Sequence, residues 1–78
     1  MWSEGIIASP TSGTNYKYWI KHFEEGSEYG INGGRISKLT IRKLDESKDL
    51  VNYDRGWDVK PKGAELKAVY EIILAKYN

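Results

Sequence analysis

Hydrophobic positions recur with a helical period near the C-terminal end of the chain. Between residues 62 and 77 the apolar side chains are spaced three or four apart: Leu66, Val69, Tyr70, Ile73, Leu74 and Tyr77. This spacing predicts one amphipathic α-helix over 62–77. Because an isolated helix of this length is only marginally stable in water, its apolar stripe must pack on another apolar surface.

The residues before this helix alternate in the manner of β-strands. Clusters of turn-forming residues divide them into four predicted strands, over 2–8, 16–23, 35–44 and 50–59. Asn32 and Gly33 favour a tight turn before the third strand, since both adopt positive φ at low cost. Ile36 is out of step with the rest of the third strand, and a bulge near Gly34 would correct its facing.

These elements predict an α+β fold, with a four-stranded, mostly antiparallel sheet and one C-terminal amphipathic helix packed on one face. The face under the helix would form the core with Tyr18, Ile20, Leu39, Ile41, Val51 and Tyr53. The opposite face would be open and would carry Lys17, Trp19, Lys21, Phe23, Lys38, Thr40, Arg42 and Asn52. Both faces of the second strand carry aromatic residues, so the inverse assignment, with Trp19 buried, stays open.

The length of 78 residues corresponds to a single domain, 1–78. Cysteine is absent and histidine occurs once, which excludes disulfides and the common zinc-binding spacings, so we expect no metal and no cofactor. The longest apolar stretch, residues 72–75, is too short to cross a bilayer, and the N-terminus lacks the basic and apolar regions of a signal peptide. We therefore expect a soluble, cytoplasmic protein.

No residue pattern indicates catalysis, and we expect a protein without enzyme activity. His22 has no serine or cysteine near it in the sequence, and a lone histidine in a strand is more often structural than catalytic. Asp54 and Asp58 share one face of a strand but would lie roughly 13 Å apart, which is too far for a paired acid and base.

The aromatic content, three Trp, six Tyr and one Phe, raises the question of binding. A small sheet uses large side chains to fill its core, but Tyr and Trp also favour half-exposed binding surfaces. The segment 53–58 places Tyr53, Arg55 and Trp57 around a glycine, a composition typical of protein-binding hot spots. Arg35, beside the glycines of 30–34, adds a second arginine to this candidate contact.

The open sheet face is the other candidate surface. Trp19 and Phe23 on this face suit either protein contact, including contact with a second copy, or the stacking of bases. In the second case Lys21, Lys38 and Arg42 would neutralise phosphates. The net charge of +1 lowers the expectation of nucleic acid as a partner but is compatible with a local basic stripe.

Two runs, SEYGINGGRISKL at 27–39 and NYDRGWD at 52–58, resemble an uncharacterised domain-of-unknown-function family of short proteins from phages and low-GC Gram-positive bacteria. The resemblance covers about residues 18–78 and assigns no activity, cofactor or site residue. It implies a mobile-element setting, where small proteins without catalytic groups commonly bind a host factor, as anti-CRISPR inhibitors do. Our leading hypothesis is a phage-encoded, non-enzymatic module that contacts a host or phage protein or forms a homo-oligomer; the alternative is a nucleic-acid-binding accessory protein.

Overall fold

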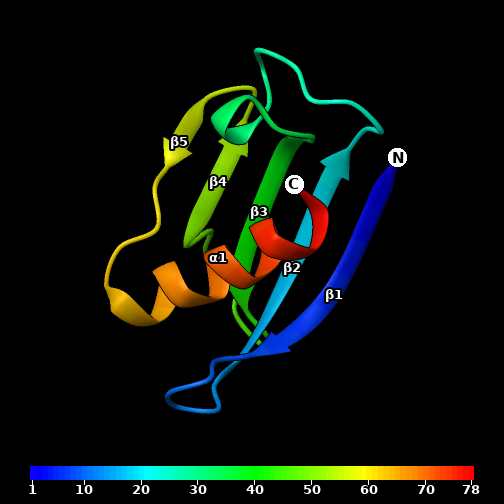
Figure 1. Cartoon of the computed structure of the whole chain (residues 1–78). Helices are drawn as coiled ribbons and strands as arrows, with labels where there is room; N and C mark the ends of the chain where they lie inside the picture. The colour runs from blue at the N-terminus through cyan, green and yellow to red at the C-terminus, as the bar shows by residue number, and fades with distance from the viewer.

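The computed structural model describes residues 1–78 and shows an antiparallel sheet of five strands with one helix lying across one face (Figure 1). The strands pair in sequence order and are β1 (Trp2–Ala8), β2 (Asn15–His22), β3 (Ile36–Lys43), β4 (Val51–Asp54) and β5 (Trp57–Val59). A 3₁₀ turn, η1 (Ile31–Gly33), precedes β3, and the helix α1 (Ala64–Tyr77) follows β5. The α+β class, the sequential antiparallel pairing and the C-terminal helix are confirmed.

The prediction of four strands is wrong, because residues 50–59 form two strands. The chain reverses at Arg55 and Gly56, and β5 pairs back onto β4 with Trp57 opposite Tyr53. Arg55 adopts a φ of 55°, and the Asp54 amide donates to the Gly56 carbonyl at 2.9 Å. Arginine rarely adopts this left-handed conformation, so the residue types give no sign of the reversal.

A β-bulge at Ser37 sets the facing of β3. Ile36 and Lys38 pair with consecutive residues of β2, so Ser37 has no partner on that strand. Ile36 therefore points into the core in spite of its irregular spacing, and both Ile36 and Ser37 are buried. The predicted bulge is present, but it lies at Ser37 rather than near Gly34. The predicted turn also forms, since Asn32 and Gly33 have φ values of 54° and 73°.

The core lies between α1 and the face of the sheet that α1 covers. Its sheet residues include every predicted strand position, and the whole set is Tyr16, Tyr18, Ile20, Ile31, Ile36, Leu39, Ile41, Val51, Tyr53, Leu66, Val69, Tyr70 and Ile73. Full burial of one such aliphatic or Phe-sized side chain stabilises a fold by about 1.5–3 kcal/mol. Since α1 covers this face alone, the opposite face is left open.

Hydroxyl contacts fix where α1 lies on the sheet. Near its start, Glu65 accepts hydrogen bonds from the hydroxyls of Tyr16 at 2.6 Å and Thr11 at 3.1 Å. Near its end, the hydroxyls of Tyr18 and Tyr77 are 2.9 Å apart. These contacts tie both ends of α1 to β2 and to the turn that precedes it.

Candidate functional site

The face of the sheet opposite α1, here called the open face, carries the candidate site. Its side chains form rows across β1, β2 and β3. The first row holds Trp2, Lys21 and Lys38, the second Glu4, Trp19 and Thr40, and the third Ile6, Lys17 and Arg42. Neighbours in such a grid lie about 5 Å apart across the strands and about 7 Å apart along them, so long side chains from adjacent rows touch.

Trp19 lies in the middle row with two cations close to its ring. The ring centroid is 5.0 Å from Lys17 Nζ and 5.3 Å from Arg42 Cζ, both within the range of a cation–π contact. Arg42 is also paired with Asp49. The predicted facing of Trp19 is confirmed, and the inverse assignment, in which Trp19 belongs to the core, is wrong.

Lys21 lies among the most exposed rings of the open face. Its Nζ is 5.6 Å from the ring centroid of Phe23 and 5.9 Å from that of Trp2, which is also 6.0 Å from Lys38 Nζ. Trp2 is 60% exposed and Phe23 is 48% exposed. Trp2 and Phe23 therefore flank Lys21, whose neighbour Trp19 on β2 has its own cations.

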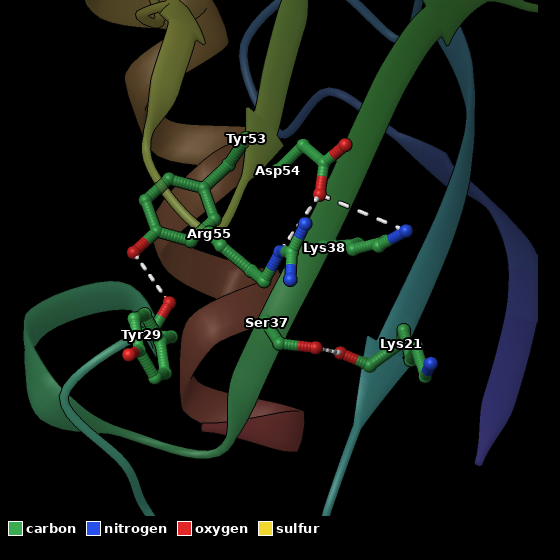
Figure 2. Close-up of polar contacts among 7 residues, drawn as sticks. All are labelled: Lys21, Tyr29, Ser37, Lys38, Tyr53, Asp54 and Arg55. Carbon is green, nitrogen blue, oxygen red and sulfur yellow. Dashed lines mark hydrogen bonds and ion pairs between the residues drawn. The ribbon is translucent and has the colours of Figure 1, made fainter.

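The cations of the open face are only partly paired with acids. Lys17 and Lys21 take part in no salt bridge, whereas Asp54 Oδ1 lies 3.7 Å from both Lys38 Nζ and Arg55 Nε (Figure 2). These distances are longer than hydrogen bonds, and half-exposed pairs of this kind contribute about 0–1 kcal/mol. The ammonium groups of Lys17 and Lys21 are therefore available to an incoming anion, whereas the Arg42 guanidinium is already hydrogen-bonded to Asp49.

Three residues of β1 belong to this surface and were missed by the sequence reasoning. Trp2, Glu4 and Ile6 share the open face, while the intervening residues of β1 turn towards α1 and are half-buried. Ile6 is 59% exposed, close to the value for Trp2. The hydrophobic pattern of residues 2–8 could not have placed them there, because the apolar Trp2 and Ile6 lie on the exposed face and the small Ser3 and Gly5 face α1.

The residues expected to form a protein contact do not lie in one patch. Tyr53 and Trp57 face α1: their ring centroids are 5.0 Å apart, and the Trp57 ring lies 5.6 Å from that of Tyr70. Tyr53 is buried and Trp57 packs against the core, so both are explained as core side chains. Arg55 extends from the reversal between β4 and β5 and is exposed.

Arg35 lies outside the sheet, close to the C-terminal residue. Its Nε donates to the Asn78 carbonyl at 3.4 Å, while the Asn78 side chain accepts from the Ile36 amide and donates to the Ile31 carbonyl. Arg35 lines a cavity of about 380 Å³ together with Met1, His22, Phe23 and Glu24. Phe23 connects this region to the open face.

His22 has a serine partner that lies far from it in the sequence. Ser3 Oγ and His22 Nε2 are 3.0 Å apart, and the His22 ring lies 5.3 Å from the ring of Tyr77. A catalytic serine–histidine pair needs a third group that orients the base and donors that stabilise an oxyanion. The Ser3–His22 pair connects β1 to β2 beside the ring of Tyr77.

Groups with shifted pKa values lie on the face of the sheet that α1 covers. Hydrogen bonds from Ser12 and Tyr16 lower the pKa of Glu65 to about 2. The same bond to Glu65, together with burial, raises the pKa of Tyr16 to about 12. Burial, followed by the hydrogen bond with Tyr77, raises the pKa of Tyr18 to about 12. These hydrogen-bonded groups stabilise the packing of α1 on the sheet.

The structure defines a small α+β domain in which one sheet face carries the core and the other carries interleaved cations and aromatic rings. A family model matches the chain over residues 1–78, and its description is Domain of unknown function (DUF7678). The chain belongs to this family, which confirms the resemblance to an uncharacterised family. No curated protein and no solved structure matches the chain. None of its helices has the length and apolar character that a membrane span requires.

Proposed function

We propose that the open face binds single-stranded nucleic acid. One observation supports this above all: every aromatic ring on the face has a cation within 6.0 Å. Bases of any sequence stack on aromatic side chains, and Lys and Arg neutralise the phosphates between them. A surface that alternates rings with cations is therefore complementary to a strand that alternates bases with phosphates.

The arrangement suits an unpaired strand better than a duplex. Stacking on a protein side chain requires bases that are not paired with another strand. Sequence readout of a duplex instead uses a helix or β-ribbon of the protein that enters a groove. Trp2 and Trp19 are diagonal neighbours across β1 and β2, at about 7–8 Å, so one strand can stack a base on each ring. Lys21 lies between these two positions and Phe23, where it can contact the intervening phosphate.

Binding of a short single-stranded oligonucleotide, followed by fluorescence anisotropy at several salt concentrations, tests the proposal. Trp19→Ala should weaken binding about 5- to 100-fold, the loss of one stacked base. The logarithm of the affinity should fall with the logarithm of salt with a slope of about −2 to −3 if three or four cations engage phosphates. Lys67→Ala, on the exposed side of α1, is the control and should bind normally. Equal affinities of the Trp19 and Lys67 variants would refute the proposal.

A second candidate, protein contact, is favoured by the outer edge of β1 (Figure 1). Edge strands are usually short or protected by charges and proline. The other edge, β5, has three residues and is followed by Lys60 and Pro61, whereas β1 has seven residues with Glu4 as its one charge. A host or phage protein, or a second copy of the chain, could add a strand here, as an inhibitor of host defence would require.

Sedimentation velocity over a wide concentration range tests the self-association form of this candidate. A dimer that Ile6→Lys abolishes, while Lys67→Ala preserves it, would support pairing through β1. If the protein is a monomer at all concentrations, the self-association hypothesis is refuted, and β1 remains a candidate site only for a different protein.

A further inference from the structure

A cavity of about 310 Å³ lies where the open face meets the loop before β3 and the β4–β5 reversal. Its lining combines three cations, two aromatic rings and two hydroxyls: Lys21, Lys38, Arg55, Phe23, Tyr29, Ser27 and Ser37. No acidic side chain lines it. Such a lining is chemically matched to a ligand that joins a phosphate to a flat ring system.

We propose that this cavity binds one nucleoside monophosphate unit, either free or as the end of a strand. The phosphate would lie among Lys21, Lys38 and Arg55, and the base would stack against Phe23 or Tyr29. The strand-end form of this inference rests on the proposed function, because the cavity continues the open face at Lys21 and Phe23. The free-nucleotide form does not.

The bulge at Ser37 gathers the three cations. Ser37 Oγ donates to the Lys21 carbonyl at 3.4 Å, and the Ser37 carbonyl accepts from the Arg55 amide at 2.9 Å. Lys38 follows directly in the chain. Figure 2 shows Lys21, Lys38 and Arg55 arranged around this serine, each on a different strand or turn. Bulges commonly re-aim side chains next to binding sites, and this one brings three separate segments to one point.

The reversal between β4 and β5 needs a residue in the left-handed conformation at position 55, but it does not need that residue to be an arginine. Its φ of 55° lies in the left-handed region, which glycine adopts without strain, and Gly56 beside it has no positive φ. A glycine at position 55 would make the turn more easily. Strained residues persist where a function needs their side chain, and the side chain of Arg55 lines the cavity.

Tyr29 is held in place by the core. Its carbonyl accepts a hydrogen bond from the Tyr53 hydroxyl at 2.8 Å (Figure 2), and its amide donates to the Ser27 hydroxyl oxygen at 3.2 Å. The Tyr29 side chain itself is 56% exposed. The ring is thus presented to solvent from an anchored backbone, as a stacking platform needs to be.

Asp54 would compete with a bound phosphate. Its Oδ1 lies 3.7 Å from both Lys38 Nζ and Arg55 Nε, so one negative charge is weakly shared by two of the three cations in the free protein. A phosphate carries more charge and more acceptor oxygens, and would replace Asp54 at both cations. Removing the charge of Asp54 should therefore strengthen phosphate binding.

Amide NMR titrations with adenosine monophosphate, adenosine and inorganic phosphate at low salt test the inference. Adenosine monophosphate should bind more tightly than either of the other two and shift the amides of Ser37, Lys38 and Arg55. Arg55→Gly should weaken its binding about tenfold while the fold remains as stable or becomes more stable. Asp54→Asn should strengthen it about threefold, whereas Asp58→Asn, outside the cavity, should leave it unchanged. Equal binding of adenosine and its monophosphate, or no effect of Arg55→Gly, would overturn the inference.

A second arm separates this inference from the proposed function. Oligonucleotides with and without a 5′-phosphate are compared on the wild type, Arg55→Gly and Trp19→Ala. A strand end in the cavity predicts tighter binding of the phosphorylated strand and loss of that preference in Arg55→Gly alone. Monophosphate binding without any oligonucleotide binding would support the cavity as a free-nucleotide site and refute the proposed function. Oligonucleotide binding that needs Trp19, with monophosphate binding absent, would refute the cavity and support the open face.

Discussion

The ring of Tyr18 on β2 fills the space beside Gly5 on β1, where a Cβ atom would come within 2.5 Å of the tyrosine hydroxyl. This hydroxyl also contacts Tyr77 near the end of α1. Gly5 therefore lets one ring connect the edge strand, the centre of the sheet and the helix. The same contact holds β1 in the position from which Trp2 reaches the open face.

Gly5→Ala should destabilise the protein by about 1–3 kcal/mol, because the added methyl group must displace the Tyr18 ring. Gly56→Ala is the matched control, since a Cβ at that position meets nothing within 4 Å. Urea unfolding of both variants measures the difference. Equal stabilities of the two variants would show that the Tyr18 ring does not restrict position 5.

Core packing of Trp57 and surface placement of Trp19 predict opposite consequences for the same substitution. Trp57→Ala should destabilise the fold by about 2 kcal/mol, since this half-buried ring packs on Tyr53 and Tyr70, but should leave oligonucleotide affinity unchanged. Trp19→Ala should have the smaller effect on stability and the larger effect on affinity. Thermal unfolding measures the stability of both variants, and fluorescence anisotropy measures their affinity for the oligonucleotide. Loss of affinity in Trp57→Ala with an intact fold would contradict the assignment of Trp57 to the core and not to the binding surface.

The hydrogen bonds that Glu65 accepts, first from Ser12 and then from Tyr16, predict a dependence of stability on pH. The pKa of Glu65 is lowered from 4.5 to about 2, so the folded state binds fewer protons and this contribution is complete above pH 4.5. It is lost as the pH falls from 4.5 towards 2. The Glu65→Gln variant should therefore lose less stability over this acid range than the wild type, as measured by urea unfolding at each pH.

At alkaline pH the dependence of stability on pH has the opposite sign, since stability is lost as the pH rises. The pKa of Tyr16 is raised from 10.0 to about 12, so its contribution is complete below pH 10 and is lost as the pH rises towards 12. Tyr16→Phe should flatten this loss only in part, because the pKa of Tyr18 is raised to about 12 as well. An alkaline loss of stability that is identical in wild type and Tyr16→Phe would contradict the role of this hydroxyl.

The sequence predicts those parts of the fold that depend on the regular spacing of hydrophobic side chains along a helix or a strand. The helix follows from the spacing of Leu66, Val69 and Ile73. The facing of β2 was favoured by Tyr18 and Ile20, but the aromatic Trp19 on the other face left the inverse assignment open until the structure decided it. Because these positions are set by burial, the open face and its cations could be anticipated. The contribution of β1 was not, because its apolar residues Trp2 and Ile6 lie on the exposed face.

Backbone conformation is where the prediction fails. The left-handed φ of Arg55 divides one predicted strand into β4 and β5, and the unpaired Ser37 shifts the expected bulge along β3. Neither feature is specified by residue type, since arginine and serine both occur commonly in strands. Yet these two residues are hydrogen-bonded to each other and form the cavity with Tyr29, so the cavity could be found only in the structure.

The most direct test of the account is an amide and indole NMR map of the protein titrated with a short single-stranded oligonucleotide at low salt. We predict that the indole N–H signals of Trp2 and Trp19 and the amides of β1, β2 and β3 shift, while the Trp57 indole and the exposed side of α1 do not. Shifts confined to α1 or to the surroundings of Trp57, or no shifts at all, would contradict the assignment of the open face as a nucleic-acid surface.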